Sequence, residues 1–174
     1  MFDPFEIDFT NKVDLSACFE ALLSIGVPDR TKVIKTWLHG WATSSRIKGE
    51  FLFNCLLGCA DATDSLSHYL QCPRIFGAFS FLWPETSSDP LIRCGLCSPC
   101  KQSLAKVACM FSAYHSIKSE FVRDFEFNAS TQIQTDKFWV LFAQSLSAEA
   151  VDRALCRTLF DRAQFADFFR LPLR

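Results

Sequence analysis

The 174-residue sequence lacks long apolar runs, low-complexity tracts and internal repeats. Its longest apolar stretches, 51–60 and 75–83, are much shorter than the roughly 20 residues that a membrane-spanning helix requires, so we expect no membrane span. The N-terminus is acidic and lacks the cationic start and apolar stretch of a signal peptide, which predicts an intracellular protein, cytoplasmic or nuclear. Disulfides are rare in such a reducing compartment, so the nine cysteines are expected as free thiols or metal ligands.

Charge is also scarce, because only 21% of the residues are charged and the net charge is −1. Acidic residues dominate the first twenty positions, where Lys12 is the single basic side chain. Between positions 29 and 50 the balance reverses, and the basic residues are Arg30, Lys32, Lys35, Arg46 and Lys48. A local basic segment can contact phosphate groups in a neutral protein, although an ordinary solvated surface explains the same charges.

Apolar residues make up 49% of the chain and mostly recur at helical spacing, which predicts a packed, mainly α protein. Helices are expected over 14–25, from 29 or 31 to 39, over 75–83, 102–123, 137–146 and 148–169, with Ser147 as a cap for the last. Residues 85–99 carry loop signals, 128–135 form a polar linker, and 49–55 supply at most one short strand.

We therefore predict a helical domain with a small Cys-Cys-His-Cys zinc finger inserted. Its segments are an acidic N-terminal helical segment (1–28), a basic lead-in and the finger (29–84), and a helical C-terminal region (85–174).

The finger is predicted from four residues at ligand spacing: Cys55-x3-Cys59, then eight residues, then His68-x3-Cys72. Zinc prefers four thiolate or imidazole ligands in a tetrahedron, and short Cys/His pairs separated by about a dozen residues supply them. We therefore expect one structural zinc ion. The alternative is that the cysteines are ordinary core residues and His68 is a hydrogen-bonded core histidine.

Local signals fit both ligand pairs. Gly58 permits a tight turn at the first pair. A helix capped by Asp64 or Ser65 would place His68 and Cys72 on one face, because they are four residues apart.

A second thiol cluster consists of Cys94, Cys97 and Cys100. With Cys109 or His115 as a fourth ligand, it would form another metal site. A thiol-rich loop packed against the following helix explains the same pattern.

The pattern Cys-x3-Cys-x8-His-x3-Cys-Pro, followed by an aromatic-rich stretch ending in Trp83, resembles the zinc-binding region after the reverse transcriptase domain of non-LTR retrotransposon proteins. The residues Thr-Trp-Leu-His-Gly-Trp at 36–41 and Ser-Ser-Arg-Ile at 44–47 are similar to the basic lead-in to that finger. Ala-Tyr-His at 113–115 is similar to the helix that follows it in some members. The likeness covers about residues 30 to 120.

This resemblance implies a tail that holds RNA or single-stranded DNA while another domain performs synthesis. Carried over by motif, the zinc ligands are Cys55, Cys59, His68 and Cys72. The resemblance implies that Arg46, Lys48 and Arg74 contact phosphate and that Trp41 or Trp37 stacks on a base, although each Trp also fits a place in the core.

The sequence departs from the family in lacking its catalytic residues. Reverse transcriptases hold two metal ions with an Asp-Asp pair, and no Asp-Asp dipeptide occurs in this chain. The single Pro-Asp dipeptide, at 28–29, precedes the finger, whereas the endonuclease of related elements follows it. We therefore expect a non-catalytic module that binds nucleic acid.

Two other functions remain open from the sequence. One is a helical protein-interaction domain in which the zinc finger is purely structural. The other is a thiol enzyme that uses Cys97 with His115 as a base, although nothing in the sequence brings these two residues together.

Overall fold

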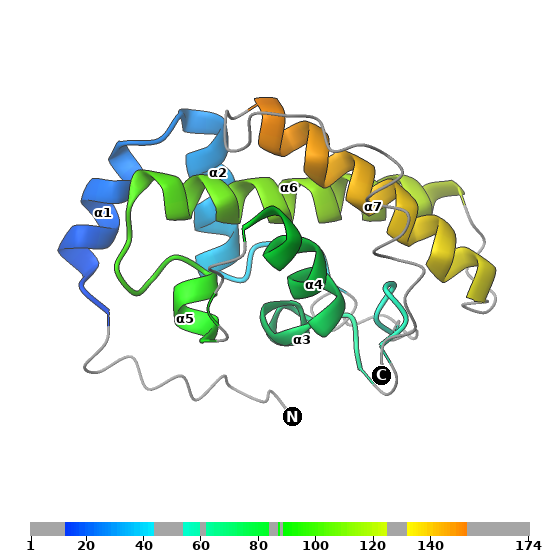
Figure 1. Ribbon diagram of the computed structural model, residues 1–174. Helices are drawn as coiled ribbons and strands as arrows, with labels where there is room; N and C mark the ends of the chain where they lie inside the picture. Colours follow the sequence, from blue (N-terminus) through cyan, green and yellow to red (C-terminus); the bar gives the residue numbers. More distant parts are fainter. Residues whose placement is uncertain are drawn as a thin grey trace.

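The computed structural model describes residues 13–43, 54–59, 62–83, 87, 89–124 and 132–152. The helices in these residues are α1 (Leu15–Leu23), α2 (Val27–Trp37), α3 (Leu66–Gln71), α4 (Pro73–Leu82), α5 (Pro90–Arg93), α6 (Lys101–Asp124) and α7 (Gln132–Asp152). Extended pairing within the described part is limited to one isolated antiparallel bridge, Asn54 to Thr63. The predicted mainly α fold with a Cys-Cys-His-Cys group is therefore confirmed (Figure 1).

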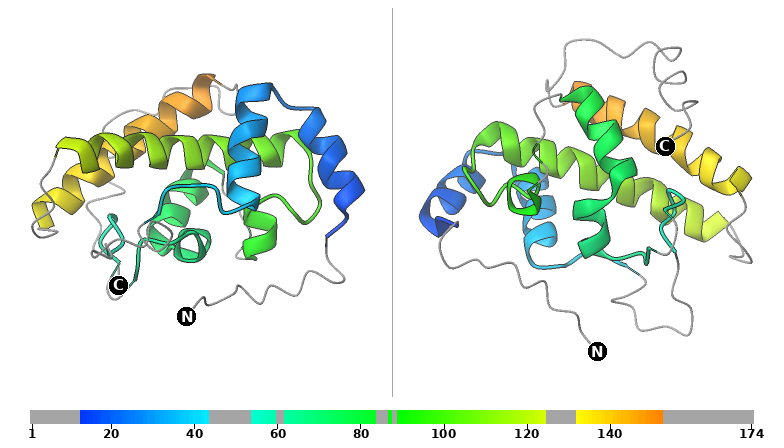
Figure 2. Two further views of the ribbon diagram at one scale, coloured as in Figure 1. Left: turned by 180° about the vertical axis from the view of Figure 1, so that it is seen from behind. Right: turned by 60° about the horizontal axis from the view of Figure 1, so that its bottom comes forward.

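The long helix α6 is the centre of the fold, and α7 and α2 pack along it most extensively (Figure 1). Helices α1 and α2 lie near one end of α6, and residues 54–59, which carry the first two predicted ligands, lie towards the other end (Figure 2). Most of the apolar face predicted for 102–123 is buried in α6, namely Leu104, Val107, Ala108, Phe111, Tyr114 and His115. One hydrophobic cluster contains residues from α1, α2, α3, α4, α6 and α7, so the finger and the helices share a core.

The first two helices follow local signals closely. Asp14 caps α1 by accepting a hydrogen bond from the Ala17 N–H at 3.1 Å. Helix α2 begins two to four residues earlier than predicted, with Gly26 as its N-cap and Pro28 in its first turn. Proline is tolerated there because the first N–H groups of a helix have no partner inside it.

The prediction of a helix break at Ser147 was wrong, because α7 runs through this position without interruption. Phe138, Phe142, Leu146 and Ala150 are all buried at four-residue spacing, so one continuous stripe packs inward on both sides of Ser147. The predicted polar linker was also wrong over 132–135, which belong to α7. Residues 128–131 and 153–169 lie outside the described residues.

Smaller differences concern the loops. The region 85–99 contains the single-turn helix α5, which Asp89 caps by accepting from the Leu91 N–H at 2.8 Å. Of the weak strand predicted over 49–55, residues 49–53 lie outside the described residues and Asn54 makes only the isolated bridge. None of the helices in the described part is long and apolar enough to cross a membrane.

Candidate metal centre

The first ligand pair lies on a tight turn. The Gly58 N–H donates to the Cys55 carbonyl at 2.9 Å, and Gly58 has a φ of 77°, which favours glycine. The Cys55 N–H donates to the Ala62 carbonyl at 2.7 Å, which ties the two sides of the loop together. This turn brings Cys59 back towards Cys55.

The second ligand pair is held by α3. Of the two predicted caps, Ser65 is the one used, because its hydroxyl accepts from the His68 N–H at 3.2 Å. His68 lies in α3 and Cys72 ends it, so their four-residue spacing places both side chains on one face. The Cys72 carbonyl accepts from the Phe76 N–H at 3.0 Å, which joins this face to α4.

The four predicted ligands converge. The ligand atoms of Cys55, Cys59, His68 and Cys72 all lie within 4.8 Å of one another, and this group could hold a metal ion. Cys55 and Cys72 are buried, whereas Cys59 and His68 are half-buried. Among the residues that the structure describes, no other group of three or more His, Cys, Asp or Glu side chains has this geometry.

The donor set fits a cation. Hydrogen bonds from Cys55 and Cys72 lower the pKa of the Cys59 thiol, and a smaller effect comes from the positive charge of Arg74. The pKa of Cys72 is raised, because its hydrogen bonds to Cys55 and Cys59 favour the thiol and burial disfavours a second negative charge. Three thiolates in this space therefore need a compensating positive charge, which a metal ion supplies.

The imidazole of His68 gives an independent indication. Its Nε2 atom is buried and has no hydrogen-bond partner among the described residues. An unpaired buried polar atom costs about 1–3 kcal/mol. Metal coordination would remove this cost. The alternative from the sequence, a core histidine whose nitrogen atoms are satisfied by hydrogen bonds, is not observed at Nε2.

A buried ion pair attaches the ligand loop to α6. Lys118 Nζ lies 2.5 Å from Asp64 Oδ2 and also donates to the Ala42 carbonyl at 2.8 Å and the Tyr69 hydroxyl at 3.4 Å. Asp64 is fully buried and Lys118 is 8% exposed. Burial lowers the pKa of Lys118, and Asp64 opposes this shift. Sequence reasoning missed this pair, although Lys118 lies seven residues after Phe111 on the apolar face of α6, where a charged residue is unusual.

Next to this pair, His115 packs as a neutral aromatic ring. It stacks on Trp41 with 4.2 Å between the ring centroids and 3° between the planes, and meets Tyr69 edge-on at 5.8 Å. Burial lowers the pKa of His115 to about 3, with smaller effects from Lys118 and Lys35. Trp41 Nε1 donates to Thr36 Oγ1 at 2.9 Å.

The structure describes three of the five residues predicted to contact nucleic acid. Arg46 and Lys48 lie outside the described residues. Arg74 is half-buried in the first turn of α4, beside Cys59. Trp41 is half-buried, and one face of its ring lies against His115. Trp37 is also half-buried, and its Nε1 donates to the Cys94 carbonyl at 2.8 Å.

The second thiol cluster does not form a group with metal-site geometry in the described part of the chain. Cys94 is buried, donates to the Leu91 carbonyl at 3.3 Å, and has a pKa raised by burial to about 12. Cys100 instead caps α6, since its sulfur accepts from the Ser103 N–H at 3.4 Å while Ser103 Oγ accepts from the Cys100 N–H at 2.9 Å. Cys109 is buried and its thiol points to the Leu146 carbonyl at 3.8 Å.

No protein-family model, no curated protein and no solved structure matches this chain.

Proposed function

We propose that the chain is a non-catalytic module that one structural zinc ion stabilises and that binds RNA or single-stranded DNA. The four-ligand group is the observation that carries the proposal. Tetrahedral zinc with Zn–S bonds of about 2.3 Å places its sulfur atoms about 3.8 Å apart. The Cys59 and Cys72 sulfurs are 3.6 Å apart, which is compatible with this geometry.

The zinc would act in folding and not in chemistry. Four protein ligands complete a tetrahedron and leave no position for a reacting water molecule. The Lys118–Asp64 pair connects the ligand loop to α6, and Leu56 and Leu57 of this loop are buried in the shared core. Binding of a structural zinc contributes on the order of 10 kcal/mol in small finger domains, enough to order such a loop.

Support for nucleic-acid binding comes from the likeness to the retrotransposon finger and from Arg46, Lys48 and Arg74, which lie near the finger in the sequence. A zinc ion with three thiolates and one neutral imidazole carries a net charge of about −1. The positive charge of Arg74, beside Cys59, offsets that charge and, with Arg46 and Lys48, would allow a phosphate backbone to approach. Base stacking on Trp41 is limited to the ring face that His115 does not cover.

The test is binding of labelled single-stranded RNA and DNA to the zinc-loaded chain by fluorescence anisotropy over a salt series. Each phosphate contact adds about 0.7 to the slope of log K against log salt for single strands. The variant Arg46→Gln, Lys48→Gln, Arg74→Gln should therefore bind more weakly and reduce the slope by about 2. Equal affinity and slope in parent and variant would reject these residues as phosphate contacts.

A matched pair of single variants separates a local effect from total charge. Arg74→Gln should weaken binding more than Lys101→Gln, which removes an exposed charge at the start of α6, away from the metal centre. Zinc content is measured in every variant, because Arg74 also stands next to a ligand. Weaker binding with full zinc content identifies Arg74 as a nucleic-acid contact.

A protein-interaction domain is the second candidate, and one observation favours it. Four large apolar side chains, Leu15, Phe19, Leu23 and Val27, are more than 60% exposed on α1 and at the start of α2. They lie away from the metal centre, so on this alternative the zinc is purely structural (Figure 2). Absence of any salt-dependent binding to nucleic acid would favour this candidate.

A further inference from the structure

A row of exposed apolar side chains runs along α1 and onto the start of α2. Leu15, Phe19 and Leu23 follow one another at four-residue spacing along α1 and are 65%, 63% and 68% exposed. Val27, the first residue of α2, is 66% exposed. We call these four residues the α1 stripe. A contiguous apolar row of this kind is typical of a surface that contacts another molecule.

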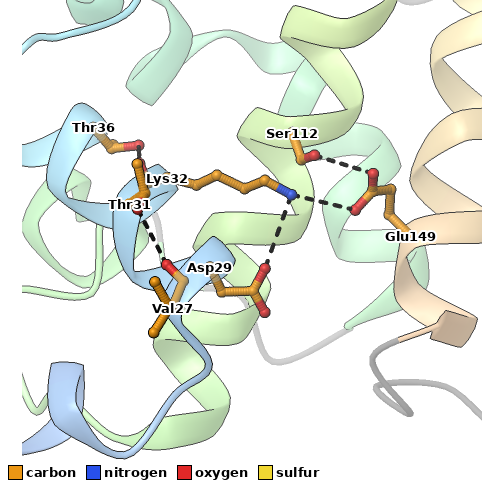
Figure 3. Close-up of polar contacts among 7 residues, drawn as sticks. All are labelled: Val27, Asp29, Thr31, Lys32, Thr36, Ser112 and Glu149. Atoms are coloured by element: carbon orange, nitrogen blue, oxygen red, sulfur yellow. Dashed lines mark hydrogen bonds and ion pairs between the residues drawn. The ribbon is translucent and has the colours of Figure 1, made fainter.

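Contacts with the neighbouring helices hold the α1 stripe in place. Arg30 of α2 donates hydrogen bonds of 3.0–3.1 Å to three carbonyls at the C-terminal end of α1, those of Leu22, Leu23 and Ile25. Lys32 Nζ lies 3.9 Å from the Asp29 carboxylate and 4.0 Å from that of Glu149, which ties the start of α2 to α7 (Figure 3). A surface that is already ordered loses less conformational entropy when it binds.

The two ends of α1 carry opposite charges. Asp14 caps the N-terminal end, is exposed, and forms no ion pair in the part of the chain that the structure describes. At the C-terminal end, the Arg30 guanidinium contacts backbone carbonyls and has no acidic partner among the described residues. Lys32, the next cation along α2, already lies between two carboxylates. An unpaired negative charge therefore marks one end of α1 and an unpaired positive charge the other.

This arrangement makes the α1 stripe complementary to a second copy of itself in antiparallel orientation. With Phe19 at a two-fold axis, Leu15 of one copy lies opposite Leu23 of the other, because each is four residues from Phe19. The same symmetry brings Asp14 of each copy to the end of α1 at which Arg30 of the other copy lies. A parallel pair would instead place like charges side by side, which disfavours it.

We propose that two copies of this chain associate through the α1 stripe about a two-fold axis, with their α1 helices antiparallel. The two apolar rows then cover each other, and two Asp14–Arg30 contacts select the antiparallel orientation. Helix α1 lies at the end of the molecule away from residues 54–59, so this contact is separate from the metal centre and does not depend on nucleic-acid binding (Figure 2).

Sedimentation equilibrium of the full zinc-loaded chain over a concentration series tests the association. One short helix makes a small interface, so we expect a dissociation constant on the order of 10 μM. Phe19→Asp places a charge at the two-fold axis and should raise this constant at least about tenfold. The control is Leu38→Asp at the C-cap of α2, a 76% exposed position about 16 Å along the helix axis from Val27, and it should associate as the parent does.

A second pair of variants tests the role of charge. Asp14→Asn keeps a good helix cap but removes the negative charge, so it should raise the dissociation constant about threefold to tenfold. Glu20→Gln removes an equal charge from an exposed residue next to Phe19, where the two copies would bring like charges together. It should leave the dissociation constant unchanged or lower it. Equal weakening by both variants would contradict the antiparallel pairing of Asp14 with Arg30.

Photocrosslinking identifies what covers the stripe without a disruptive substitution. A chain with Phe19→p-benzoylphenylalanine is mixed with an unmodified ¹⁵N-labelled chain, and we expect a crosslink to the labelled tryptic peptide 13–30, which contains α1. Leu38→p-benzoylphenylalanine is the control and should not crosslink to that peptide. Zinc content confirms that each variant remains folded at the metal centre.

Three results would overturn the proposal. They are a parent chain that stays monomeric throughout the series, a dimer that persists unchanged in Phe19→Asp, and a Phe19 crosslink that lies within one chain or joins a peptide other than 13–30.

Discussion

The amino group of Lys118 and the carboxylate of Asp64 form a buried ion pair that joins α6 to the loop between the second and third metal ligands. The same amino group donates to the Ala42 carbonyl and the Tyr69 hydroxyl. One side chain therefore fixes three separate stretches of chain. The metal centre and the helical core are linked through it.

Removing the amino group should destabilise the whole fold. Lys118→Met leaves the Asp64 carboxylate buried without its cation, which costs about 3–5 kcal/mol when a buried pair is broken on one side. Urea unfolding of the zinc-loaded chain at pH 7 measures this loss. Lys101→Met, an exposed lysine of the same helix, serves as control and should change stability by about 0.5 kcal/mol or less. Equal stabilities of the two variants would show that the ion pair does not anchor the loop.

The zinc content of the purified chain should depend on the four predicted ligands. Native mass spectrometry of the purified chain should show one zinc ion, and Cys55→Ser with Cys59→Ser should abolish it, because two of four ligands are lost. The control, Cys97→Ser with Cys100→Ser, removes two thiols outside the four-ligand group and should retain the ion. Two zinc ions in the parent would restore the second cluster as a metal site, and none would reject the zinc assignment.

Stability should fall in acid partly through His115. Its folded pKa of about 3 is below the unfolded value of 6.5, because burial disfavours the charged ring. Between these values the unfolded chain binds more protons, so the contribution is complete above pH 6.5 and is lost as the pH falls, by about 1.4 kcal/mol per unit. His115→Phe removes this term but keeps the zinc ligands, so its unfolding free energy should depend less on pH between 6.5 and 5. Parallel pH profiles of parent and variant would contradict the burial of a neutral His115.

The Trp41 ring should contribute to the free energy of unfolding as well as to any binding of nucleic acid. Trp41→Ala loses the stack on His115 and the hydrogen bond to Thr36, and we expect a cost of about 2–3 kcal/mol for this half-buried ring. Leu38→Ala, at a residue that is 76% exposed, is the control and should cost much less. Thermal or urea unfolding measures both. If the two variants were equally stable, Trp41 would be free to serve mainly as a stacking surface.

Local features were predictable because they depend on neighbouring residues. The cap at Asp14 and the cap at Ser65, one of the two residues predicted for α3, follow from side-chain chemistry. The convergence of Cys59 and Cys72 with their partners was also predictable, since short ligand spacings leave few backbone paths.

Features that depend on packing between distant segments were not predictable in this way. Ser147 has the chemistry of a helix cap, yet α7 continues through it because Leu146 and Ala150 are both buried. The thiols of the second cluster have a spacing suggestive of metal binding, yet Cys94 is buried as a thiol and Cys100 caps α6.

The sequence by itself therefore determined a mainly α protein with four side chains that could hold a metal ion, because helical periodicity and ligand spacing act over a few residues. Tertiary structure alone decided that Lys118 pairs with Asp64, 54 positions away, and that His115 stacks on Trp41. Contacts between residues so far apart are selected by which combination buries apolar surface while satisfying every buried charge, and no local pattern carries that information.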